Sequence, residues 1–148
     1  MTTVAPSHRR TVAPFLVLAL TACSPPPSSL PAVGPALQTV SLPNISSAAE
    51  PVQKQIRERY ATLRSAIDRS GTSAEDLARA YGDLGKLLVA TEYFDVAETC
   101  LANAHALAPS EMRWPYFLAH LHRLRNDPAG AARFFEQALA LAPSDAPG

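Results

Sequence analysis

Apolar and polar positions follow a helical period over most of the second half of the chain. In residues 50–70 the apolar positions recur at spacings of three and four, which places them on one face of a helix. They are Val52, Ile56, Tyr60, Leu63 and Ile67. We expect Gly71 to follow the end of this helix, and Thr72 with Glu75 to form a capping box for the next one.

The pattern then repeats with a period of 34 residues, so that segment 78–111 is followed by a second copy, 112–145. The aligned pairs are Leu84 with Leu118, Gly85 with Ala119, Leu88 with His122, Ala97 with Ala131, Leu101 with Phe135, Ala104 with Ala138 and Pro109 with Pro143. Small residues at fixed positions let two antiparallel helices approach closely, and the prolines end each unit. The sequence therefore predicts an all-α fold of about five helices.

This pattern resembles the tetratricopeptide repeat, a helix-turn-helix unit that buries its apolar face by stacking on its neighbours. In the first copy the marked positions of the family fall on Tyr81, Leu84, Gly85, Leu88, Ala97, Leu101, Ala104 and Pro109. The second copy departs at Pro115, where a large residue is usual, with Trp114 beside it, and at His122. The resemblance implies a short helical-hairpin solenoid that the helix at 50–70 covers on one side.

The resemblance also implies a binding surface, because in this family the first helix of each repeat lines a concave groove for a peptide or partner helix. The matching positions are Arg79, Gly82, Lys86, Val89 and Ala90 in the first copy and Arg113, Tyr116, His120, Arg123 and Leu124 in the second. Their cations and Tyr116 suit an acidic or aromatic-bearing segment. The asparagines of the carboxylate clamp found in chaperone-binding members are missing, and an ordinary exposed helix surface is the alternative.

The beginning of the chain is typical of a targeting segment. His8, Arg9 and Arg10 precede nine residues, 12–20, without a polar side chain, a run too short to span a bilayer. The following Leu-Thr-Ala-Cys resembles the lipobox of bacterial lipoproteins, which implies a signal peptide at 1–22 and an acylated Cys23 that anchors the chain in a membrane. An ordinary secretory signal and a wrongly chosen start codon remain alternatives.

Between this cysteine and the helices, residues 24–49 carry no charge and six prolines. Such a composition predicts an extended segment without a packed core. We therefore expect 23–49 to be a disordered tether that holds the helices away from the membrane. Ser24 favours the outer membrane, because an aspartate at this position resembles the inner-membrane retention signal of enterobacterial lipoproteins.

Few residues suggest chemistry. The formal net charge is zero, which gives no reason to expect nucleic acid. His120 and His122 lie roughly 200° apart around a helix and cannot share a metal, and His105 lies elsewhere. Cys100, the only thiol left once Cys23 is acylated, fits a buried structural position. Nucleophile elbows and phosphate-binding loops are absent, so the sequence predicts no enzyme, no cofactor and no metal site.

Together these features predict a membrane-anchored, non-catalytic tetratricopeptide scaffold that faces the periplasm and binds an envelope protein or peptide segment. Two alternatives stay open. The chain could be the N-terminal part of a larger enzyme or sensor. It could also be a self-assembling structural protein that dimerises through its last repeat, because no further helix follows to cover Phe134, Leu139 and Leu141.

Overall fold

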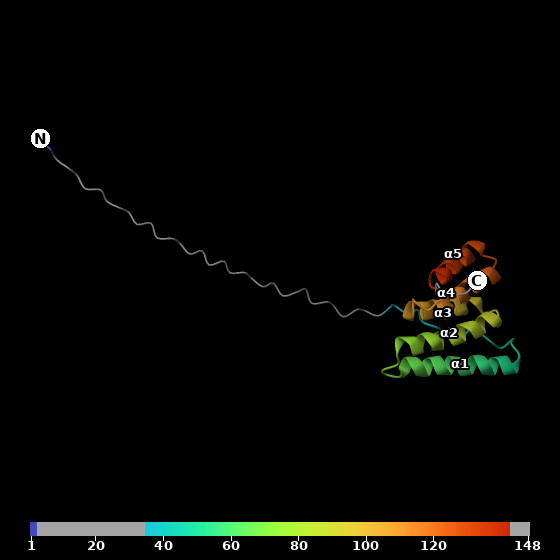
Figure 1. Ribbon diagram of the computed structural model, residues 1–148. Helices are drawn as coiled ribbons and strands as arrows, with labels where there is room; N and C mark the ends of the chain where they lie inside the picture. The colour runs from blue at the N-terminus through green and yellow to red at the C-terminus, as the bar shows by residue number, and fades with distance from the viewer. Residues whose placement is uncertain (3–34, 143–148) are drawn as a thin grey trace. The chain divides into compact units, whose positions relative to one another are not determined.

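The computed structural model describes residues 1–2 and 35–142. Its five helices are α1 (Glu50–Asp68), α2 (Ala74–Ala90), α3 (Phe94–Leu107), α4 (Arg113–Leu124) and α5 (Pro128–Ala140), and residues 35–142 contain no strand. Each helix packs on the next one along the chain, and α4 also touches α2. Figure 1 shows the helices stacked in order, with α1 at one end and α5 at the other. The predicted all-α fold of about five helices is confirmed.

The 34-residue period recurs in the backbone of the two hairpins, α2–α3 and α4–α5. In each hairpin turn one residue has a positive φ, 64° at Glu92 and 58° at Asn126. The next amide, of Tyr93 or Asp127, donates to the carbonyl oxygen five residues back, at 2.9 Å in both turns. A left-handed residue followed by this bond is the Schellman pattern for ending a helix. The repeat in the sequence is therefore a repeat of turn geometry as well.

The start of α2 differs by one residue from the prediction. Ser73 is its N-cap: the Ser73 hydroxyl accepts a hydrogen bond from the Asp76 amide at 3.0 Å and donates one to the Asp76 carboxylate at 2.8 Å. The predicted pair, Thr72 with Glu75, does not form. The Thr72 hydroxyl is already engaged, because it donates to the Ala66 carbonyl of α1 at 2.8 Å.

The core lies where the helices cross, and small residues make the crossings close. Its largest fully buried aliphatic side chains are Ile56, Leu63, Leu84, Leu88, Leu101, Leu118 and Leu121. A Cβ atom added at Gly85 would lie 2.9 Å from Leu101 Cγ, and Ala97 and Ala119 are fully buried. These small residues at the crossings agree with the role that the sequence pattern predicts for them.

Trp114 joins α4 to α2, beside the packing of α4 on α3. Its side chain is only 2% exposed, and a Cβ atom at Gly82 of α2 would overlap the indole ring. The indole thus lies directly on the α2 backbone and fills the space beside Pro115, where a large residue is usual in the repeat. As a consequence, Gly82 is covered and does not belong to an open groove, contrary to its mapping from the family pattern.

The prediction that the tether extends to Ala49 is wrong for its last part, because residues 35–49 pack against the helices. We call residues 35–49 the strap. Val40 and Ile45 are 8% and 5% exposed and belong to the core. The Gln38 amide donates to Asn103 Oδ1 at 2.9 Å, and Asn103 Nδ2 donates to the Gln38 carbonyl at 2.8 Å.

The composition of the strap explains this difference. Leu37 and Leu42 also pack on the core, and the Tyr60 hydroxyl donates to the Val40 carbonyl at 3.4 Å. An uncharged segment can be buried without the cost of desolvating ionised groups, so apolar residues spaced along it can dock on a ready-made surface. Figure 1 shows the strap in cyan, running along the helices before the chain turns into α1.

Gly82→Ala tests the contact between the hairpins. Alanine normally stabilises a helix interior by about 0.5–1 kcal/mol relative to glycine. Here it displaces the indole, so we expect the free energy of unfolding to fall by about 1–3 kcal/mol. In a Trp114→Leu background the same change should be neutral or stabilising. Urea unfolding of the four proteins measures both steps, and an equal loss in both backgrounds would contradict the contact.

Asn103→Ala tests the strap. It leaves the amide and carbonyl of Gln38 without their partner, so we expect the free energy of unfolding to fall by about 1–3 kcal/mol. Hydrogen exchange should become faster by a larger factor for the strap amides than for the amides of α4 and α5. Gln137→Ala is the matched control, because Gln137 is the exposed equivalent of Asn103 one repeat later. Protection of the strap that survives in Asn103→Ala would argue against this anchor.

Candidate binding surface

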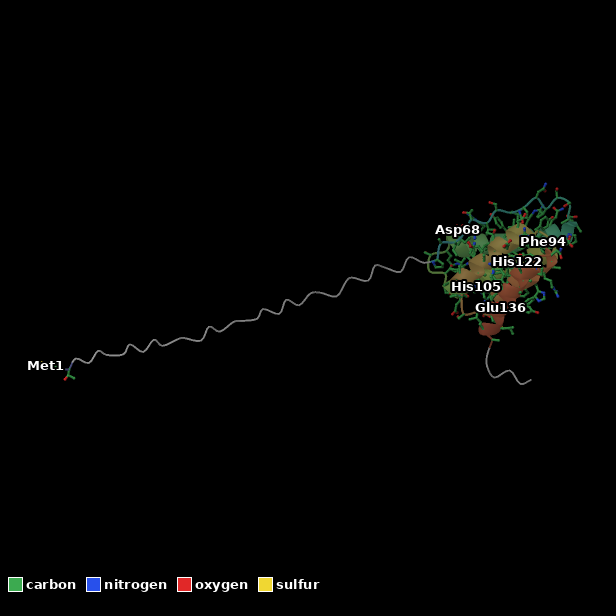
Figure 2. All side chains as sticks on the ribbon, turned by 90° about the horizontal axis from the view of Figure 1, so that it is seen from above. Met1, Asp68, Phe94, His105, His122 and Glu136 are labelled. Carbon is green, nitrogen blue, oxygen red and sulfur yellow. The ribbon has the colours of Figure 1, made fainter. Side chains whose placement is uncertain are left out.

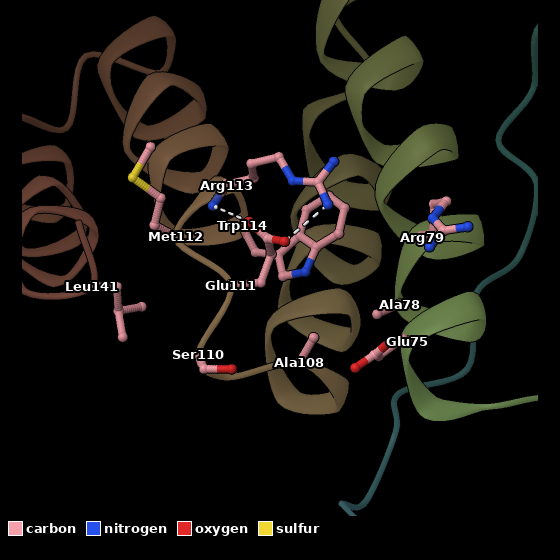
Figure 3. A pocket seen from close by; sticks show the side chains of 10 residues that line it. All are labelled: Glu75, Ala78, Arg79, Ala108, Ser110, Glu111, Met112, Arg113, Trp114 and Leu141. Atoms are coloured by element: carbon pink, nitrogen blue, oxygen red, sulfur yellow. Dashed lines mark hydrogen bonds and ion pairs between the residues drawn. The ribbon is translucent and has the colours of Figure 1, made fainter. Parts of the chain in front are cut away.

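Two of the predicted groove residues line one open pocket. Arg79 of α2 and Arg113 at the start of α4, which stand 34 residues apart, border a pocket of about 360 Å³ (Figure 3). Its other lining residues are Glu75, Ala78, Ala108, Ser110, Glu111, Met112, Trp114 and Leu141. Equivalent positions of the two hairpins thus contribute the same cation to one site. We call it the arginine pocket.

Both arginines are paired with carboxylates of their own segment. Arg113 Nη2 lies 2.9 Å from Glu111 Oε2, and Arg79 Nη1 lies 3.4 Å from Asp76 Oδ1. The hydrogen bond from Arg113 lowers the pKa of Glu111, and the same bond raises the pKa of Arg113. These pairs are exposed and contribute little to stability, so their groups can exchange partners with a bound segment. The pocket therefore combines apolar lining residues with charged ones whose partners can be exchanged.

Lys86 and Val89 lie apart from this pocket. Lys86 Nζ pairs with Asp83 at 2.8 Å and lies 5.7 Å from the centre of the Phe117 ring. It lines a separate pocket between α1 and α2. Val89 is half-buried and packs on the core. The structure thus does not bring all the mapped positions of α2 into one groove.

Tyr116, His120 and Arg123 lie on another surface, with a residue of α5. The ring centres of Tyr116 and His120 are 4.5 Å apart, and Phe135 lies 6.0 Å from Tyr116 and 5.3 Å from His120, all edge to face. Arg123 Nη2 lies 3.1 Å from His120 Nδ1. Burial, and then the charge of Arg123, lower the pKa of His120 and favour its neutral form. The mapping from the family pattern missed Phe135, because it considers only the first helix of each repeat.

His122, which replaces the leucine of the first copy, is held by polar partners. Its Nδ1 lies 2.8 Å from Asp127 Oδ2, and its ring stacks on Phe134 at 5.1 Å between centres. Asp127 is also the N-cap of α5 and accepts from the Gly130 amide at 2.9 Å. This amide, and then His122, lower the pKa of Asp127. His122 therefore ties the end of α4 to the start of α5.

Arg125 joins α3 to the turn between α4 and α5. Arg125 bonds to both Asp95 and Glu98 of α3, at 3.0 Å in the case of Asp95.

The histidines of the described helices do not form a metal site. Figure 2 labels His105 and His122, which lie on different helices. In residues 35–142 no three His, Cys, Asp or Glu side chains are placed to hold a metal ion.

Cys100 is fully buried in α3. Burial raises the pKa of its thiol to about 12. A thiolate is the reactive form of cysteine, so Cys100 is protected both by its low accessibility and by its protonation.

Cys23 and the whole predicted signal peptide lie outside the described residues, apart from Met1 and Thr2. No helix in the described part of the chain has the length and apolar character needed to cross a bilayer. Comparison of the chain with protein-family models, with curated proteins and with solved structures finds no match in any of the three.

Alkylation tests the state of Cys100. At mildly alkaline pH we expect iodoacetamide to leave Cys100 unmodified in the folded chain and to modify it after denaturation in guanidinium chloride, with peptide mapping to distinguish it from Cys23. The raised pKa stabilises the fold fully below pH 9, the ordinary value, and this contribution is lost as the pH rises towards about 12. In Cys100→Ala the alkaline loss of stability should be smaller. Rapid labelling of Cys100 in the folded chain would contradict its burial.

Proposed function

We propose that the chain is a non-catalytic tetratricopeptide-type scaffold, anchored in a membrane of the bacterial envelope through acylated Cys23, which binds a segment of another envelope protein. One observation carries the proposal. Arg79 and Arg113, at the same position of two successive hairpins, border one open pocket that is lined by both apolar and polar side chains. A repeated cation on neighbouring helices suits an extended segment that carries acidic side chains or free backbone carbonyls.

The packing of the helices supports this role. Trp114 holds α4 on α2, so the two arginines belong to helices with a fixed separation. A binding surface that is already ordered avoids part of the conformational cost of association.

The strap changes what the proposed anchor would do. A free chain from Cys23 to Glu50 could span at most about 90 Å, but a chain that is held from Pro35 onward can span only about 40 Å. The scaffold would therefore work near the membrane surface. This favours a partner that is itself embedded in the membrane or bound close to it.

The test uses the full chain expressed with its own leader in a bacterial host. A photo-crosslinking amino acid replaces Met112, which lines the arginine pocket, or Ile67, a similarly exposed residue of α1, as the matched control. We expect an envelope protein to be captured at Met112 and not at Ile67. Combining Arg79→Glu with Arg113→Glu should reduce the yield by about tenfold or more, which corresponds to about 1.4 kcal/mol or more of binding energy.

The same preparation tests the anchor. The N-terminal peptide should carry acyl chains on Cys23, and Cys23→Ser should release the protein from the membrane fraction. Capture of the same proteins at both positions, or capture that survives in the double arginine variant, would contradict binding at the pocket. An unmodified Cys23 would contradict the anchor alone.

A further inference from the structure

The α4–α5 hairpin forms the end of the helical stack opposite α1 (Figure 1). It carries apolar side chains that are exposed. We call this exposed surface the end face. It consists of Tyr116, His120 and Leu124 of α4 and Phe135 and Leu139 of α5. Leu139 is 74% exposed, Leu124 54% and Tyr116 43%. These are three of the large hydrophobic side chains that the described part of the chain leaves exposed, and they share one hairpin.

The α2–α3 hairpin shows which element packs on the equivalent surface. One repeat earlier, the corresponding residues are Gly82, Lys86 and Ala90 of α2 and Leu101 and His105 of α3. There α4 packs against both helices, with Trp114 on Gly82, and Leu101 is fully buried. The end face is thus the second copy of a surface whose first copy is covered by a helix.

The interface between the α2–α3 hairpin and α4 also pairs opposite charges. Residues 74–107 carry six acidic and two basic side chains, whereas residues 113–140 carry four basic and two acidic ones. Arg125, at the end of α4, pairs across the interface with Asp95 and Glu98 of α3. An acidic hairpin has therefore received a basic helix.

The end face belongs to the basic hairpin, so its charge is opposite to that of the covered α2–α3 surface. The positions of Asp95 and Glu98 are occupied by Ala129 and Ala132 in the second copy, so both of these carboxylates are lost, while Glu136 stands at the position of Ala102 and Arg133 at that of Thr99. Arg123 stands where the first copy has Val89. A helix that docks here meets excess positive charge at the edge of an apolar surface. Electrostatic complementarity favours a helix with acidic residues beside its apolar stripe.

A second copy of this chain does not meet that condition. Two end faces packed on one another would bring two basic hairpins together, including both copies of Arg123. Packing of the end face on α1 of another copy would add the four basic and three acidic residues of that helix, again a basic excess. Juxtaposed like charges work against such contacts.

The shape of the end face adds a second condition. Gly82 leaves room for the indole of Trp114, but Tyr116 stands at the equivalent place and its ring occupies that room, in contact with His120 and Phe135. A docking helix therefore needs a small residue where α4 has its tryptophan.

We propose that the end face binds an amphipathic helix of another protein, with acidic residues flanking its apolar stripe and a small residue opposite Tyr116. The proposal shares with the proposed function only the idea that this chain binds proteins. Its surface lies on α4 and α5 and does not include Arg79 of the arginine pocket.

The chain supplies the template for the probe. The acidic probe is a synthetic peptide that copies residues 111–125 with Trp114→Ala and with Arg113→Glu, Arg123→Glu and Arg125→Glu. The basic probe carries Trp114→Ala alone. Binding is measured by fluorescence anisotropy to the full chain in lipid nanodiscs, with empty nanodiscs as the reference. We expect the acidic probe to bind about tenfold more tightly than the basic one, with an affinity that falls as salt is added.

Variants locate the site. Leu139→Glu should weaken binding of the acidic probe about tenfold or more, because it places a like charge in the apolar contact. Ile67→Glu, at an exposed position of α1, is the matched control and should bind as the wild type does. A third probe, acidic but with Trp114 retained, should bind poorly to the wild type and better to Tyr116→Ala. Circular dichroism verifies that each variant is folded.

Each opposite outcome overturns the proposal. Absence of binding, equal affinity for the two probes, or binding that Leu139→Glu does not change would exclude this occupant. A dimer in sedimentation experiments that Leu139→Glu dissociates would identify a second copy as the occupant instead. Arg79→Glu distinguishes the two proposals: it should leave the probe bound, whereas it disrupts the arginine pocket.

Discussion

The contact between Trp114 and Gly82 is the interaction on which the remaining structure depends. An indole can lie on a helix backbone only where no side chain intervenes. The position of Trp114 of α4 therefore requires a glycine at position 82 of α2. Together with the packing of α3 on α4, this contact sets the separation of the two hairpins. It places Arg79 and Arg113 on one pocket, and it orients α4 so that Tyr116 faces outward at the end of the stack.

The two hairpins have the same backbone and different roles. Both turns end their first helix with the same hydrogen bonds, and both use small residues at the crossing. The α2–α3 hairpin is covered by α1 on one side and by α4 on the other. The α4–α5 hairpin is covered on one side among the described residues, and its other side keeps Leu139 exposed. The α2–α3 hairpin therefore contributes mainly to the core, whereas the α4–α5 hairpin also contributes an exposed apolar surface.

Burial of the strap shows how the same composition can serve two purposes. A segment without charges and rich in proline predicts an extended chain, and residues 35–49 are indeed neither helix nor strand. They are nevertheless fixed, because Asn103 satisfies both backbone groups of Gln38 and the core receives Val40 and Ile45. Extended backbone is ordered wherever its polar groups find partners and its apolar side chains find a surface.

The sequence by itself determined the helices, their order and the 34-residue period. These follow from the spacing of apolar residues and from turn residues, which act over a few positions. The groove could be mapped only as separate positions: Arg79 and Arg113 meet, whereas Lys86 and Val89 lie elsewhere.

The tertiary structure decided what depends on partners distant in the sequence. Gln38 and Asn103 are 65 residues apart, and no local pattern joins them. Gly82 becomes covered only when α4 docks, and Phe135 joins Tyr116 only when α5 folds back on α4. Local propensity determines which segments are helical, but burial is a property of the assembled surfaces, because each side chain is covered by whatever the rest of the chain brings against it.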